Sequence, residues 1–297
     1  MIWSSVLGKG CDAIAGYAPG TILNAVLGEN PGTNKIIGLG TAGNILILLN
    51  LILNHPACKV YVDWYSKGNC IVFDKNYKED FNIINPFDYY FEQLYKPHGN
   101  SISFNAKTFL SYANCNELNC GLYKKSKELF YSNFKLKPCL TDDIDAFYNK
   151  SFKGKNVLGI QVRVTDMLHY HLTPHGIGYF VDKARNIMLQ RPVDAIFIAT
   201  DSTVTINAFR TAFPNVDILY QKNISRSDKE NDAVGPQDRI DYTFDNNNIR
   251  KYHNFLSGKE VLIDIFLLSK CNYFLRSHSS VSDVAIVLND NIQELFV

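Results

Sequence analysis

Apolar runs alternate with amphipathic stretches in the second half of the chain, and this pattern predicts a parallel α/β sheet. Short apolar runs separated by helical periodicity are typical of successive βαβ units, in which helices cover both faces of the sheet. We expect one doubly wound domain over residues 151–297. Its predicted strands are 157–163, 194–200, 216–220 and 272–276, and its predicted helices lie near 177–190, 203–212, 259–269 and 281–288.

The first half shows the same alternation less regularly. A strand at 35–38, a helix at 45–54 and a strand at 60–64 would form one βαβ unit, which favours a second parallel sheet. Residues 1–34 are rich in glycine and alanine and are expected to hold only short helical pieces. Residues 1–150 are therefore predicted to form a first domain that contains parallel sheet.

The junction between the two predicted domains is polar. Thr141 is expected to cap a helix that runs to about Tyr148, with Asp142 and Asp143 in its first turn, where the helix dipole favours acids. The glycine-containing stretch 150–156 follows and is predicted to be the linker.

Composition limits the classes of function. The chain has 297 residues, of which 46% are hydrophobic, and its net charge is +1, so any anionic ligand must be bound by a local site. The apolar run 36–54 is long enough to suggest a membrane span, but Asn44, Asn50 and Asn54 interrupt it and favour a buried helix. Without a recognisable signal peptide, the expected compartment is cytoplasmic.

The seven cysteines are widely spaced and form no CxxC motif. We expect them to be reduced thiols, with a loop disulfide between Cys115 and Cys120 as a minor alternative.

The octapeptide GIQVRVTD, residues 159–166, carries the strongest chemical signal. It brings Gln161, Arg163 and Asp166 to the carboxyl end of a predicted strand, which is where open α/β sheets bind ligands. A guanidinium there suits a phosphate, because its donors are planar and permanently charged. The alternative is that Arg163 only pairs with Asp166.

Three sequence blocks follow one another in the second half: 161–166 (QVRVTD), 196–202 (IFIATDS), and 261–271 with 274–282 (VLIDIFLLSKC and FLRSHSSVS). In this order they resemble the fucosyltransferase superfamily with an HxRxxD-type motif, which includes α1,6-, α1,2- and protein O-fucosyltransferases. Residues 38–44 and 62–64 resemble its amino-terminal glycine loop and second strand more weakly. The chain departs from the family at Gln161, where a histidine is usual, and at Val164, where α1,6-type members have a second arginine.

The resemblance implies an α/β fold of the GT-B type, with two Rossmann-like doubly wound domains facing a cleft. Residues 1–150 would lie on the acceptor side, and residues 151–297 would bind a nucleotide sugar. The implied activity is inverting, metal-independent glycosyl transfer, with GDP-fucose as donor and a glycan or glycoconjugate hydroxyl as acceptor. No cofactor, nucleic-acid partner or membrane span is expected.

Donor binding is assigned first to Arg163, as the clamp on the β-phosphate. Ser279 and Ser280 lie where a strand leads into a helix and are expected to bind phosphate, or else to act as a plain helix cap. Asp264 lies inside an apolar helix, and the resemblance places it near the nucleotide. Asp201 either caps a helix or contacts the nucleoside. The resemblance adds the glycine-loop positions Gly38, Gly40 and Asn44.

Catalysis is assigned to the segment after Arg163. Asp166 is expected to orient Arg163 or the following loop, and His169 and His171 are the candidate proton acceptors, because an imidazole accepts a proton near neutral pH. His175 and Tyr179 are assigned to the acceptor side. A metal site built on the H-x-H pair is the alternative, although the set lacks a fourth ligand.

Three other functions stay open on the sequence. The departures at Gln161 and Val164 are compatible with another nucleotide sugar, or with a catalytically silent sugar-binding relative. The stretch 38–43 also reads as GxGxxG, with Asp63 about 20 residues later, which is the pattern of a dinucleotide-dependent oxidoreductase. That last reading gives no role to the three blocks of the second half.

Overall fold

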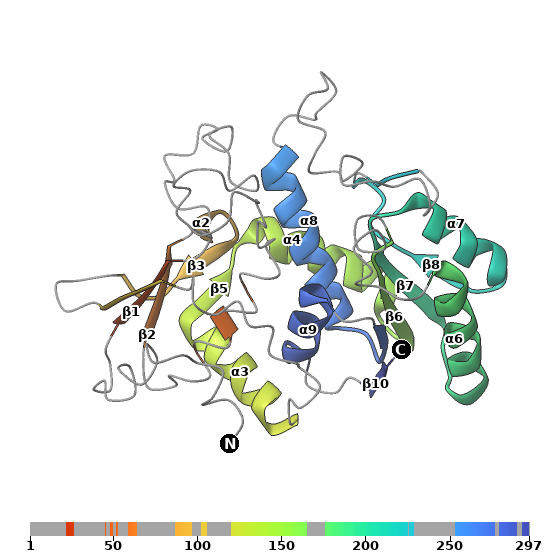
Figure 1. Cartoon of the computed structure of the whole chain (residues 1–297), viewed down its shortest axis with the longest axis horizontal. Coiled ribbons are helices and arrows are strands. Elements are labelled where there is room, and N and C mark those ends of the chain that lie inside the picture. Colours follow the sequence, from red (N-terminus) through yellow and green to blue (C-terminus); the bar gives the residue numbers. More distant parts are fainter. Residues whose placement is uncertain are drawn as a thin grey trace. The chain divides into compact units, whose positions relative to one another are not determined.

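The computed structural model shows two units that both contain parallel β-sheet (Figure 1). The first unit is Met1–Thr141 and the second is Asp142–Val297. The predicted boundary at residue 150, and the roles given to the two halves, stay predictions. The structure describes residues 22–26, 45, 48, 49, 52, 59–63, 87–96, 102–105, 120–164, 176–224, 226–228, 253–276, 279–289 and 293–296.

The first unit contains a sheet of order β2-β1-β4, in which β1 (Ile22–Val26) pairs in parallel with both β2 (Lys59–Asp63) and β4 (Ile102–Asn105). The expectation of only short helical pieces within residues 1–34 was therefore wrong. The apolar run ILNAV pairs on both sides with strands far along the sequence, which local periodicity does not reveal. The predicted strand 35–38 lies outside the described residues.

Between β1 and β2, the four described helical residues are buried at the spacing expected of one helix face. Ile45, Leu48, Leu49 and Ile52 are helical and each is at most 2% exposed. The helix expected at 45–54 is thus confirmed at these positions.

An antiparallel pair, β3 (Phe91–Gln93) with β5 (Phe134–Leu136), lies next to α2 (Phe87–Tyr90) and α3 (Cys120–Asn133) in sequence. Its aromatic side chains pack together, with Phe87 stacked on Phe91 at 4.6 Å between ring centroids. Asn133 ties this layer to the sheet, because its Oδ1 accepts a hydrogen bond of 2.8 Å from the Val60 N–H.

Helix α4 (Pro138–Phe147) begins three residues before the predicted cap. The N–H of Thr141 donates to the Lys137 carbonyl at 3.1 Å, so Thr141 already lies inside the first turn. Proline is favoured at the first helical position, because its fixed φ suits a helix and its missing N–H would have no partner there. A π-helical turn (Tyr148–Phe152) follows and leads to Gly154, whose φ of +78° suits glycine.

The second unit contains a five-stranded, fully parallel sheet of order β10-β9-β6-β7-β8. The strands are β6 (Val157–Val162), β7 (Ala195–Thr200), β8 (Asp217–Leu219), β9 (Tyr273–Arg276) and β10 (Gln293–Phe296). The helices are α6 (Ile177–Gln190), α7 (Thr203–Ala212), α8 (His253–Leu268) and α9 (Ser280–Val287). Each predicted strand of this domain is present, and α6 and α7 have the predicted bounds.

The two faces of this sheet are covered differently. Leu158, Ile160 and Val162 of β6 join α6 and α7 in one buried cluster. On the other face Gly159 lies against the end of α8, and Figure 1 shows α8 and α9 on the side of the sheet opposite α6 and α7. Every residue of β6 is buried, as expected of a strand covered on both faces.

Replacing Gly159 with alanine is expected to destabilise the protein. A Cβ at this position would lie 2.8 Å from the Cys271 Sγ and 3.2 Å from Leu268 Cδ2, so α8 would have to move away from β6. Overpacking of this kind costs about 1–3 kcal/mol, which urea unfolding would measure.

Gly178→Ala is the matched control, because a Cβ there meets no atom within 4 Å and the residue lies in α6. It should leave stability unchanged or raise it by up to about 1 kcal/mol. A Gly159→Ala protein as stable as the wild type would contradict the close contact between α8 and β6.

Candidate functional site

The order of the strands in the second sheet places the candidate site at their carboxyl ends, which we call the carboxyl edge of the sheet. The chain adds β7 and β8 on one side of β6, and then crosses over to add β9 and β10 on the other. Open α/β sheets bind ligands outside the carboxyl ends of their strands, at the point where the direction of winding reverses. Here that point lies between β6 and β9.

Arg163 lies at this edge, directly after β6. Its Nε lies 3.6 Å from Asp201 Oδ2, and 36% of its side chain is exposed. Asp201, which follows β7, also accepts a hydrogen bond of 3.3 Å from the Val164 N–H through Oδ1. Arg163 is therefore paired across the strand ends and still reachable from solvent. Asp166, its predicted partner, lies outside the described residues.

Ser202, rather than Asp201, caps helix α7. The Ser202 side chain accepts from the Thr205 N–H, so the helix-cap interpretation of Asp201 was wrong. Ser202 also forms a bridge with Ser227, which holds the segment after β8 against the end of β7. The interpretation of Asp201 as a nucleoside contact stays a prediction.

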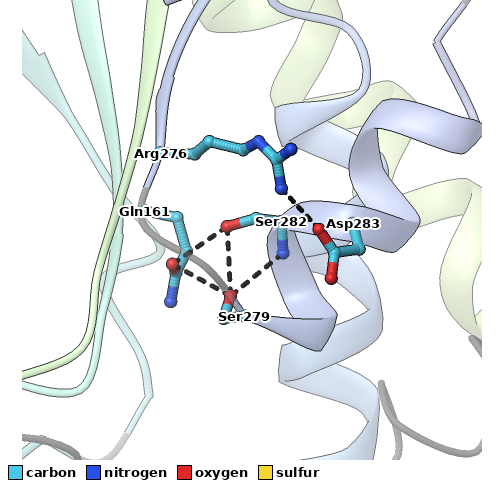
Figure 2. A network of polar contacts seen from close by, with 5 residues as sticks. All are labelled: Gln161, Arg276, Ser279, Ser282 and Asp283. Atoms are coloured by element: carbon cyan, nitrogen blue, oxygen red, sulfur yellow. Dashed lines mark hydrogen bonds and ion pairs between the residues drawn. The ribbon is translucent and has the colours of Figure 1, made fainter. Parts of the chain in front are cut away.

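The start of α9 is fixed to the end of β6 by Gln161. Ser279 is the helix cap, and its Oγ accepts from the Ser282 N–H at 3.1 Å. The hydroxyls of Ser279 and Ser282 both donate to Gln161 Oε1, at 3.1 and 3.0 Å (Figure 2). The predicted cap geometry at Ser279 is thus present. Ser280 begins the helix and is partly exposed.

A buried ion pair holds the same helix to β9. Arg276, the last residue of β9, is 1% exposed and pairs with Asp283 in the first turn of α9 (Figure 2). Gln161 and Arg276 are register partners in the parallel strands β6 and β9. The two contacts that hold α9 to the sheet therefore start from neighbouring positions. Burial of a charged pair is tolerated where the partners stay in contact.

Asp264 lies in α8, next to the segment that follows β8. Its Oδ1 accepts a hydrogen bond of 2.6 Å from Gln221 Nε2, and the residue is 9% exposed. Burial raises the pKa of this carboxyl to about 7, and nearby Glu260 adds to the rise, while the Gln221 hydrogen bond and the charge of Arg226 oppose it. Asp264 therefore carries a proton for part of the time near neutral pH.

Arg226 joins these groups, and no motif in the sequence pointed to it. Its Nε donates to the carbonyl of Thr200 at 3.1 Å, and its guanidinium lies 5.3 Å from the centre of the Tyr220 ring. Among the described residues its buried Nη2 has no hydrogen-bond partner. Burial lowers the pKa of this guanidinium, against the raising effect of Asp264 and other acidic neighbours. Arg226 thus places a half-buried guanidinium beside the end of β7 and within electrostatic reach of Asp264 in α8.

Tyr179 lies in the first turn of α6, partly buried, with Lys183 Nζ 5.2 Å from its ring centre. Seven predicted site residues fall outside the described part of the chain, and their roles stay predictions: Gly38, Gly40, Asn44, Asp166, His169, His171 and His175.

Three further sequence expectations can be compared with the described residues. No group of three or more His, Cys, Asp or Glu side chains is placed there to hold a metal ion. Within the same ranges, no helix combines the length and hydropathy needed to cross a bilayer. Cys139 and Cys271 are free thiols, and burial raises the pKa of Cys271.

Comparison with known proteins bears on the fold. No protein-family model matches the sequence, and no curated protein matches it. Among solved structures, the chain is similar to the α1,6-fucosyltransferase NodZ from Bradyrhizobium. The NodZ crystal soaked with GDP-fucose gives a TM-score of 0.54 at 15% identity, covering 93% of this chain and 94% of NodZ. NodZ co-crystallised with GDP gives 0.53 at 16% identity, covering 93% and 95%.

This likeness confirms the predicted α/β fold class of the GT-B type. It also confirms, at the level of the fold, the resemblance to fucosyltransferases that the three sequence blocks indicated.

Replacing Asp264 with asparagine is expected to remove a pH-dependent loss of stability. Because the folded-state pKa of about 7 lies above the ordinary 3.8, the folded protein binds the extra proton between these values. Wild-type stability from this group therefore falls as pH rises from about 4 to 7, by up to about 1.4 kcal/mol per unit. Asparagine keeps the acceptor for Gln221 and carries no charge.

Denaturant unfolding of both proteins at pH 4 and pH 8 would measure this. The two should be about equally stable at pH 4, and the variant should be more stable by roughly 2–4 kcal/mol at pH 8. Asp217→Asn, at an exposed ion pair with Lys155, is the control and should show no such difference. A constant gap between wild type and Asp264→Asn would contradict the raised pKa.

Proposed function

We propose that this protein is an inverting, metal-independent glycosyltransferase that transfers fucose from GDP-fucose to a glycan or glycoconjugate hydroxyl. The observation that carries the proposal is the placement of Arg163, which is partly exposed at the carboxyl end of β6, the strand that borders the switch point, and pairs with Asp201 after β7. The GT-B fold shared with NodZ, a fucosyltransferase with structures containing GDP-fucose and GDP, supports the choice of reaction and donor.

The reaction requires positive potential at the leaving group. The anomeric carbon–oxygen bond to the β-phosphate breaks, and the departing diphosphate takes up the electron pair. Arg163 supplies a permanent charge for this purpose. The first turn of α9 supplies the N–H groups of Ser280 and Val281, which helix geometry leaves outside the intrahelical hydrogen bonds.

Arg163 and the start of α9 are proposed to bind the same diphosphate. Arg163 lies two residues beyond Gln161, whose amide oxygen contacts Ser279 directly. Two residues of strand span about 7 Å. The dipole of α9 and the guanidinium would then face the same group of oxygens.

The nucleoside is proposed to bind on the β7 side of the edge. Asp201 and Asp264 lie there, with Arg226 interacting electrostatically with both. A carboxylate accepts hydrogen bonds from adjacent N–H donors, and guanine presents such donors on its pairing edge. Asp264 is therefore proposed to bind the base, and Asp201 to position Arg163 and contact the nucleoside.

Inversion needs a single displacement from the face opposite the leaving group. The acceptor oxygen forms the new bond to the anomeric carbon, and its proton passes to a base. His169 or His171 is proposed as that base, with Asp166 orienting Arg163 and with His175 and Tyr179 on the acceptor side. Residues 1–150 are proposed to bind the acceptor, and Gly38, Gly40 and Asn44 to contact the donor.

Two alternatives remain attached to specific residues. The departures at Gln161 and Val164 are compatible with a donor other than GDP-fucose, whose nucleotide would carry a different base. The same departures would fit a sugar-binding protein without transferase activity. Release of free nucleotide from the sugar donor, measured with and without acceptor glycans, separates an active transferase from a silent relative.

Arg163→Ala is expected to lower the rate of transfer strongly without unfolding the protein. Removing one charged donor from a developing oxyanion typically lowers turnover about 10²–10³-fold. The pair with Asp201 is partly exposed, so its loss should cost less than about 1 kcal/mol of stability. Arg191→Ala is the control, because this exposed arginine follows α6 at the opposite edge of the sheet. Near wild-type turnover in Arg163→Ala would exclude the proposed phosphate clamp.

Nucleotide binding is expected to be selective for GDP. A ligand present at 100 times its Kd stabilises the folded state by about 2.7 kcal/mol, which is visible as a rise in Tm. At equal concentrations GDP should raise the Tm more than UDP or TDP does. A larger rise in Tm with UDP or TDP would assign a different donor. No rise with any of the three nucleotides would contradict the proposed donor binding.

A further inference from the structure

We propose that Gln161 is a positioning residue for the sugar-nucleotide donor. Through Ser279 and Ser282 it holds the first turn of α9 at the carboxyl edge of the sheet, so that the N–H groups of this turn face the bound diphosphate. The inference rests on the proposed function above. In it, Arg163 supplies charge to the diphosphate, and Gln161 orients the helix that supplies the N–H groups.

The contacts of Gln161 are buried and converge on one atom. Gln161 is 4% exposed and Ser282 is fully buried. Both serine hydroxyls lie within 3.1 Å of Gln161 Oε1. Figure 2 shows the amide oxygen directed at the two serines and the amide nitrogen pointing away from them. The amide oxygen is thus the shared acceptor that joins β6 to the first turn of α9.

A count of hydroxyl hydrogens shows what this acceptor does. Each serine has one hydroxyl hydrogen, and both can be donated to Gln161 Oε1. The Ser279 oxygen then keeps its lone pairs for the Ser282 N–H, which is the cap that starts the helix. The contact of 3.0 Å between the two hydroxyl oxygens competes for the same hydrogens. Gln161 therefore settles the direction of both hydroxyls and leaves the cap intact.

This arrangement also decides which groups reach an anion. While the Ser279 hydroxyl donates its hydrogen to Gln161, that hydrogen is withheld from a phosphate oxygen. The N–H groups of Ser280 and Val281, together with the Ser280 hydroxyl, are left to bind the ligand. Their direction follows the orientation of the helix, so a small tilt of α9 would misplace all of them together.

The buried pair of Arg276 and Asp283 is the second tether of α9. Because it remains when Gln161 is replaced, the helix should shift without detaching. We therefore expect weaker donor binding, rather than loss of the fold, when the amide is removed.

Gln161→Met keeps the length of the side chain and removes the acceptor, and Ser282→Ala removes one of the two donors from the other side. Donor KM and the Kd for GDP should rise about tenfold in Gln161→Met, since one net hydrogen bond to a polar group is worth about a factor of ten. Ser282→Ala should show a smaller rise. The double variant should bind donor no more weakly than Gln161→Met alone, because both changes break the same contact.

Asn133→Leu is the matched control. Asn133 is another buried amide, 3% exposed, whose Oδ1 accepts from the Val60 N–H in the first unit. Its removal should lower stability and the fraction of active protein, and hence the apparent kcat, but should leave donor KM unchanged. A purely structural role for Gln161 predicts that same pattern, so donor KM separates the two roles.

The outcomes are distinct. If the wild-type protein binds neither GDP nor GDP-fucose, the proposed function fails. If the wild type binds GDP and both Gln161→Met and Ser282→Ala bind it equally well, the positioning role is wrong while the proposed function stands. Additive losses in the double variant would also overturn it, because Gln161 would then act independently of Ser282. Should Gln161→Met not fold, the donor KM of Ser282→Ala against Asn133→Leu decides: a rise confirms the role, and no rise overturns it.

Discussion

Strand β6 is hydrogen-bonded in parallel on both sides, to β7 and to β9, and the rest of the second unit depends on this pairing. Parallel neighbours cannot be reached by a tight turn, so each connection must cross a face of the sheet as a helix. The chain first fills one side of β6 and then the other. The reversal falls between β6 and β9, where Gln161 and Arg276 are register partners.

The three arginines at the carboxyl edge of the sheet each lie near an acidic side chain, so their positive charge is largely balanced. Arg163 pairs with Asp201, Arg276 pairs with Asp283, and Arg226 interacts with Asp264. If all three acids were ionised, these pairs would sum to zero. Because burial raises the pKa of Asp264 to about 7, that carboxyl is partly neutral near physiological pH. These three pairs alone then carry between zero and one net positive charge, and the acidic Glu260, which acts on both Arg226 and Asp264, lowers that total. Directional N–H donors must therefore supply much of the affinity for an anion.

The sequence was sufficient where structure is decided locally. Helices α6 and α7 have their predicted bounds, because apolar periodicity and flanking turns occur within each segment. Strand β1 was missed, since five residues with glycine-rich surroundings become a strand only by pairing with β2 and β4. The start of α4 was misplaced because Pro138 and Thr141 both resemble helix starts, and proline, which comes first in the chain, begins the helix.

For the candidate site, the sequence predicted where it lies better than it predicted which side chains contact one another there. A motif at a strand end identified Arg163, and cap chemistry identified Ser279. The partners of such groups are distant in sequence: Gln221 lies 43 residues from Asp264, and Gln161 lies 121 residues from Ser282. No local pattern reports such pairs, which is why Gln221, Arg226 and the task of Gln161 emerged only from the fold.

Glutamine suits these contacts better than histidine, the residue usual at the matching position of the fucosyltransferases that the sequence resembles. An amide oxygen has two lone pairs and can accept from the hydroxyls of Ser279 and Ser282 together. A neutral imidazole offers one acceptor nitrogen, and a protonated one offers none. Histidine at this position would therefore leave one buried hydroxyl dependent on the other serine, and would lose its last acceptor on protonation. Glutamine and the pair of serines thus form one matched unit of side chains that neither gain nor lose a proton near neutral pH.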